Sequence, residues 1–137
     1  MRLNVTTIRW LLVVPAAWVA WYSAALIGIA IYSVGDAMCP LELMESGWCN
    51  ASWHPTFMKC VLIITASISA IFSILAGSYT APNYRSYVAN LILLVGAAFS
   101  IFFGLNSEQY VVLVSTLLCG FITARLVVIQ SRKVNAA

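Results

Sequence analysis

One short stretch of the chain, residues 36–60, holds three of the four cysteines, the single histidine and three of the four acidic residues. Within it, Cys39 and Cys49 are ten positions apart. In an oxidising compartment this spacing predicts a disulfide that closes a loop, with Cys60 as the competing partner. A ring of this size contributes about 2–3 kcal/mol of stability under the loop-entropy model.

Two reactive chemistries are alternatives to a structural disulfide. Four-helix membrane oxidoreductases that pass electrons to quinone present external cysteines, but they use a C-x-x-C pair, which this chain lacks. Thiolate, thioether and imidazole groups together suit Cu(I), although their spacing here matches no ligand pattern. The residues of this kind are Met38, Cys39, Met44, Cys49, His54, Met58 and Cys60. We therefore predict no metal site and no cofactor, and we expect His54 at the surface.

Aromatic residues flank the second loop cysteine. Trp48 and Trp53 stand on either side of Cys49 in SGWCNASW. Tryptophan near a membrane surface anchors at the headgroups, and exposed tryptophan is also enriched in protein contacts. We predict both as partner-contact residues. Trp18, Trp21 and Tyr22 lie inside the first apolar run and are expected to pack between helices.

The composition excludes an ordinary soluble domain. Of 137 residues, 63% are hydrophobic and 8% are charged, whereas a soluble domain carries about a quarter charged residues. The net charge of +3 comes from seven basic residues spread along the chain. Since they form no patch, nucleic acid is not an expected partner.

Four apolar runs cover most of the chain and are each long enough to cross a hydrocarbon core of about 30 Å. They predict an all-α integral membrane protein, an antiparallel four-helix bundle formed by a single transmembrane domain over residues 1–137. The spans are 10–35, 60–78, 87–105 and 109–130, with a long external loop at 36–59. The lipid bilayer is therefore the first expected partner.

The basic residues predict the orientation of these spans. With the N-terminus in the cytoplasm, six of the seven fall on or near the inner face and only Lys59 is outside. The six are Arg2, Arg9, Arg85, Arg125, Arg132 and Lys133. By the positive-inside rule both termini are cytoplasmic. We expect a multi-pass plasma-membrane protein of the bacterial inner-membrane type.

Small residues at a spacing of four predict the contacts between helices. Lipid tails are as apolar as leucine, so helices associate in membranes where small side chains let backbones approach. The predicted packing residues are Ala20, Ala24, Gly28, Ser69, Ser73, Gly77, Gly96, Ser100 and Gly104.

The predicted spans contain no Asp, Glu, Lys, His or Met. This argues against a proton-coupled transporter and against haem held between helices. No nucleophile–base pair is evident either. We therefore predict a non-enzymatic protein that binds a membrane protein or a second copy of itself, as an accessory subunit or an immunity or modulator protein. A quinone-linked thiol–disulfide oxidoreductase is the alternative, and copper handling ranks third.

Overall fold

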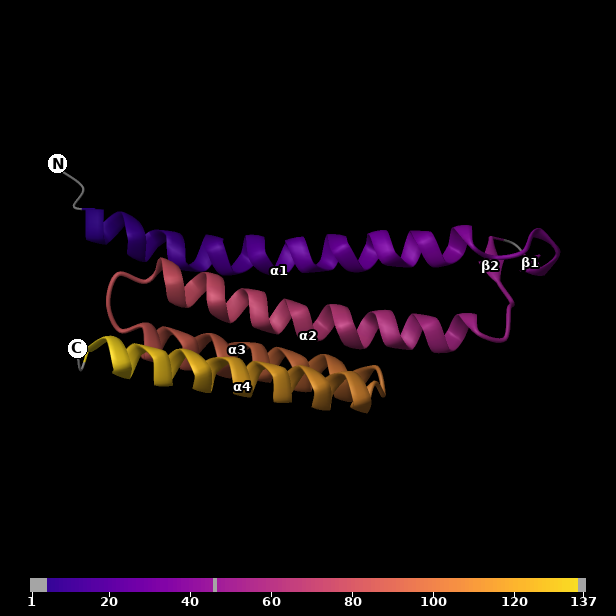
Figure 1. Ribbon diagram of the computed structural model, residues 1–137. Coiled ribbons are helices and arrows are strands. Elements are labelled where there is room, and N and C mark those ends of the chain that lie inside the picture. The colour runs from indigo at the N-terminus through magenta and orange to yellow at the C-terminus, as the bar shows by residue number, and fades with distance from the viewer. Residues whose placement is uncertain (1–4, 46, 136–137) are drawn as a thin grey trace.

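Four long helices dominate the computed structural model, which describes residues 5–45 and 47–135 (Figure 1). They are α1 (Val5–Ala37), α2 (His54–Thr80), α3 (Arg85–Asn106) and α4 (Tyr110–Asn135). A 3-10 turn, η1 (Leu41–Leu43), and two short strands, β1 (Met44–Glu45) and β2 (Trp48–Cys49), lie between α1 and α2. Each helix is long and apolar enough to cross a membrane. The chain is therefore an all-helical protein with the features of a multi-pass membrane protein.

The second helix, α2, is the centre of the arrangement. The chain reverses direction after each helix, so the start of α1 and the end of α4 lie at the same end of the molecule (Figure 1). α2 contacts all three other helices, and α3 also contacts α4. α1 packs chiefly on α2. The helices thus form a three-helix core of α2, α3 and α4, with α1 laid along one side.

Two clusters of buried apolar residues lie toward the end that holds the start of α1 and the end of α4. Ile74 of α2, Ala89 of α3 and Ala124 of α4 are each at most 2% exposed and form one cluster. α1 reaches the core nearby, where Val13 packs in a second cluster with Val88. At this end α1 is therefore tied to α3 as well as to α2.

Glycines allow α1 and α2 to approach closely along their length. A Cβ added at Gly28 would lie 2.5 Å from Oγ1 of Thr65, and one at Gly35 would collide with the ring of Phe57. In lipid such close packing takes the place of the hydrophobic effect. The seam between α1 and α2 therefore depends on the absence of side chains at these two positions.

The predicted rows of small residues lie only partly at helix contacts. Gly104 packs against Leu113, but Gly96 is exposed and an added Cβ there would meet nothing within 4 Å. Gly96 and Gly104 are eight residues apart, which is about 2.2 turns at 3.6 residues per turn, so residues spaced by four do not stay on one face of the helix. The prediction that Gly96 packs against another helix was therefore wrong. In the other positions the row residues are buried or half-buried: Ala20, Ala24, Gly28, Ser69, Ser73, Gly77 and Ser100.

Three helices are clearly longer than the bilayer requires. α1 has 33 residues, α2 has 27 and α4 has 26, which correspond to about 50 Å, 40 Å and 39 Å, against a hydrocarbon core of about 30 Å. α3 has 22 residues and is about 33 Å long. At the end away from the start of α1, α1 and α2 project beyond α3 and α4 (Figure 1).

The projecting turns explain a difference from the predicted spans. The second helix begins at His54 rather than at residue 60, because Pro55 in the first turn favours helix while polar neighbours keep the hydropathy low. The non-helical part of the predicted loop 36–59 is correspondingly shorter. A hydropathy window detects the part of a helix inside lipid and misses the turns that leave it.

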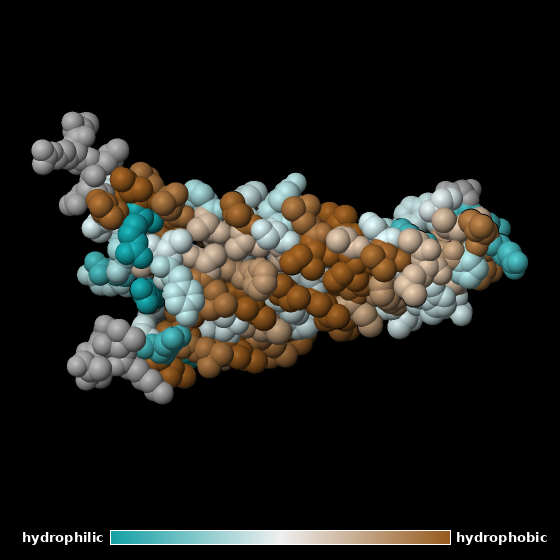
Figure 2. Space-filling view, turned by 45° about the horizontal axis from the view of Figure 1, so that its top comes forward, coloured by the Kyte–Doolittle hydropathy of each residue, from teal (hydrophilic) through white to brown (hydrophobic). Residues whose placement is uncertain are grey.

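The aromatic residues of α1 face outward. Trp18, Trp21 and Tyr22 are 66%, 48% and 58% exposed, so the expectation that they pack between helices was wrong. The reason is that α1 meets the rest of the protein chiefly through the one face that lies on α2. The view in Figure 2 shows strongly hydrophobic residues gathered along the middle of the molecule, with the hydrophilic ones at its two ends.

Candidate functional site: the outer cap

The residues at the projecting end form a small folded unit (residues 36–45 and 47–59), which we call the outer cap after the orientation proposed below. β1 and β2 pair antiparallel, with Met44 opposite Cys49 and Glu45 opposite Trp48. Gly47 has a φ of 84°, which glycine adopts without the steric cost that other residues meet. The glycine at position 47 therefore lets the backbone turn between β1 and β2 without strain.

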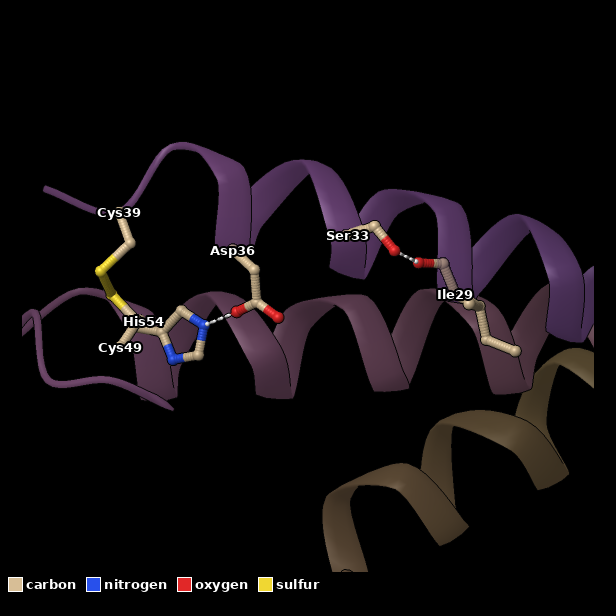
Figure 3. Close-up of polar contacts among 6 residues, drawn as sticks. All are labelled: Ile29, Ser33, Asp36, Cys39, Cys49 and His54. Carbon is tan, nitrogen blue, oxygen red and sulfur yellow. Dashed lines mark hydrogen bonds and ion pairs between the residues drawn. A yellow bond between two sulfur atoms is a disulfide. The ribbon is translucent and has the colours of Figure 1, made fainter. Parts of the chain in front are cut away.

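A disulfide closes the outer cap. Cys39 and Cys49 are bonded, with their Cα atoms 6.0 Å apart, as the close-up in Figure 3 shows. The bond joins the residues just beyond α1 to the end of β2, and the two cysteines form a small buried cluster with Ala51. Cys60, the competing partner in the sequence analysis, is a free and exposed thiol.

A hydrogen bond between His54 and Asp36 links the two helices directly beneath this disulfide. Nε2 of His54 lies 2.9 Å from Oδ1 of Asp36, and the two side chains are 8% and 34% exposed (Figure 3). A carboxylate oxygen can only accept a hydrogen bond, so Nε2 is the nitrogen that carries the proton. The expectation of a surface histidine was wrong, because α2 begins at His54 and directs this side chain toward the end of α1.

The two tryptophans of the outer cap have different environments. The Trp53 ring lies edge-on to the rings of His54 and Phe57, with centroids 5.7 Å and 5.9 Å apart. Trp53 is 41% exposed, so the rest of its surface is covered by the protein at the junction between α1 and α2. Trp48 is 69% exposed. Trp48 is accordingly the residue with more surface free for a contact.

Large apolar side chains cover the surface of the outer cap. Six of them are between 41% and 88% exposed: Met38, Leu41, Leu43, Met44, Trp48 and Trp53. They lie on the part of the α1–α2 hairpin that extends beyond the other helices (Figure 1). Lipid tails can cover exposed apolar residues along the four long helices, whereas these six lie in or next to the segment between α1 and α2. Large exposed apolar patches mark sites of interaction with proteins or membranes.

The geometry favours recognition over sulfur chemistry. Thiol–disulfide exchange requires access of a thiolate to a sulfur atom, whereas Cys39 and Cys49 are each only 8% exposed. Among residues 5–45 and 47–135, no three His, Cys, Asp or Glu side chains are grouped so that they could hold a metal ion. Nε2 of His54 is already paired with Asp36. The disulfide thus acts as a cross-link that holds the exposed surface of the cap in place.

The sequence analysis missed the contact between Asp36 and His54. A signal was present, because the only histidine and the last acidic residue of the first apolar helix stand at the two ends of one loop. The burial of His54 also depends on where α2 begins, which hydropathy did not locate.

Comparison of the chain with protein-family models, with curated proteins and with solved structures finds no match.

Proposed function

We propose that this chain is a non-enzymatic membrane protein that recognises another membrane protein through its outer cap. The observation that carries the proposal is the set of exposed apolar side chains on a disulfide-closed unit at the projecting end of α1 and α2, which we place beyond the hydrocarbon. Leu41 is 88% exposed and Trp48 is 69% exposed. Exposed tryptophan is the residue type most often found at the energetic centre of protein interfaces.

The proposed orientation places the cap outside the cytoplasm. Arg9, Arg85, Arg125 and Arg132 lie toward the opposite end of the helices, as expected when that end faces the cytoplasm. The proposed protein is then an antiparallel bundle in the plasma membrane, the inner membrane of a bacterium, with both termini cytoplasmic. A disulfide is stable in the compartment that this orientation gives the cap.

Rigidity supports a role in binding. The disulfide, the hairpin and the Asp36–His54 hydrogen bond all restrain the segment that carries Leu41 and Trp48. A surface that is already in its bound shape loses less entropy when it meets a partner. The cap therefore suits contact with an apolar patch on the outer side of a membrane protein, which is the requirement for an accessory subunit or a modulator.

Photo-crosslinking in intact membranes tests the proposal. A photoreactive amino acid is placed at position 41 or 48, and for comparison at position 99, where Phe99 is 65% exposed in the middle of α3. We expect the same discrete protein adduct from positions 41 and 48, and none from position 99. An adduct with the mass of two chains identifies a homo-oligomer as the partner.

The disulfide supplies a second arm of the same experiment. Because Cys49 holds β2 in place, Cys49→Ser should weaken the adduct from position 48, while Cys60→Ser at the free thiol should leave it unchanged. Only lipid adducts at positions 41 and 48, or the same protein adduct from position 99, would overturn the proposal. A permanent accessory subunit should co-purify with its partner from unstressed cells. A modulator that binds only under particular conditions should not.

A further inference from the structure

A groove of about 430 Å³ lies between α2 and α4. Its walls are mainly apolar, from Ile71 and Leu75 on α2 and from Ile122 and Leu126 on α4. Along α4 the lining extends from residue 119 to residue 130. These positions are separated by about 16 Å at 1.5 Å per residue, close to half of a hydrocarbon core of about 30 Å. The groove therefore has the length of an acyl chain in one leaflet.

The groove leads into a polar hollow at the end of the molecule opposite the outer cap. This hollow shares Gln130 with the groove and is also lined by Tyr79 and Arg85. The Tyr79 hydroxyl donates to Oε1 of Gln130 at 3.5 Å, and the Arg85 guanidinium lies 5.8 Å from the centre of the Tyr79 ring. Hydrogen-bond donors and a positive charge thus stand where the apolar groove ends.

The positive charge of Arg85 has no acidic residue near it. All four acidic residues of the chain lie at the other end, in the outer cap or in the turn between α3 and α4: Asp36, Glu42, Glu45 and Glu108. Within the described part of the chain, the one close contact between a basic and an acidic side chain is the Asp36–His54 pair. An anion from outside the protein is therefore the natural partner for Arg85.

We propose that the α2–α4 groove binds one anionic phospholipid from the leaflet that surrounds the inner helix ends. An acyl chain lies along the apolar walls, and the phosphate meets the Arg85 guanidinium. Arginine suits this role because its planar guanidinium can bind two phosphate oxygens at once. A zwitterionic lipid carries its own cation, so the unpaired arginine favours a lipid with net negative charge. This proposal is independent of partner binding at the outer cap.

Native mass spectrometry of the delipidated full-length protein tests the site. Phosphatidylglycerol and phosphatidylcholine with the same acyl chains are titrated separately. We expect one phosphatidylglycerol to bind about tenfold more tightly than phosphatidylcholine, and Arg85→Gln to remove most of that difference. Arg125→Gln is the matched control, because Arg125 lies over the Phe121 ring at 4.9 Å and does not line the groove.

The apolar part of the site needs its own variant. Cys119→Phe should fill the deep end of the groove and weaken phosphatidylglycerol binding, whereas Leu118→Phe, at a neighbouring side chain outside the groove, should not. If Cys119→Phe does not fold, the Arg85→Gln comparison still decides the question.

Three results would overturn the proposal. The first is equal affinity for the two lipids, or an affinity for phosphatidylglycerol that Arg85→Gln leaves unchanged. The second is full competition by soluble glycerol phosphate, which would show an anion site that ignores the groove. The third is a dimer that forms without lipid and is lost in Cys119→Phe, which would make a second copy the occupant.

Discussion

The imidazole of His54, the first residue of α2, pairs with the carboxylate of Asp36, the next-to-last residue of α1, across 2.9 Å. The Cys39–Cys49 disulfide lies immediately beyond this pair (Figure 3). Two bonds of different kinds therefore close the same end of the α1–α2 hairpin. Since α1 packs chiefly on α2, these bonds also hold the outer end of α1 to the rest of the protein.

Loss of the Asp36–His54 hydrogen bond should weaken that closure. Asp36→Ala removes the acceptor and leaves the mostly buried His54 without its partner, so we expect a loss of about 1–3 kcal/mol in the free energy of unfolding. Thermal unfolding in detergent measures the effect. Glu42→Ala is the control, because Glu42 is an exposed acid of the same cap. Equal Tm values for the two variants would contradict the structural role of the pair.

The disulfide should act as a single unit. Cys39→Ser and Cys49→Ser are each expected to destabilise the protein by about 2–3 kcal/mol, because each removes the same cross-link from the unfolded state. The double variant should be no less stable than either single variant. Thiol alkylation of freshly isolated membranes should label Cys60 but neither cysteine of the pair. Labelling of both Cys39 and Cys49 would reject the static bridge.

The seam between α1 and α2 can be tested with two glycines. Gly28→Ala should destabilise the protein by about 1–3 kcal/mol through overpacking against Thr65. Gly96→Ala is the matched control and should be neutral or stabilising by up to about 1 kcal/mol, since a Cβ there meets open space. Adding Thr65→Ala should recover part of the loss at Gly28 and none of any change at Gly96. Equal effects of the two glycine variants would show that the seam is not tightly packed.

The proposed orientation is tested with a reporter enzyme that is active only outside the cytoplasm. Fused after Ala137 it should be silent, and inserted near Ser46 it should be active, because the basic residues gather toward the inner ends of the helices. Immunodetection of both fusions controls for expression. The reverse pattern of activity would overturn the orientation and the external placement of the outer cap.

Hydropathy was sufficient to find the four helices, because a membrane-spanning helix must present apolar side chains to lipid over about 20 residues. The spacing of Cys39 and Cys49 likewise indicated their pairing, since a short ring can form between residues that are already close along the chain. These features depend on local composition and distance along the sequence. They require no knowledge of which helix faces which.

The tertiary structure decided the rest. The small-residue row of α3 looked continuous, but the helix rotation turns Gly96 away from its neighbours while Gly104 meets Leu113. The pairing of Asp36 with His54 depends on the register between α1 and α2, which the close approach at Gly28 and Gly35 establishes. Periodicity alone does not specify the neighbour of each helical face. That choice is made by side-chain fit between segments far apart in the chain, and it places α1 at the side of the core and makes the outer cap a single cross-linked surface.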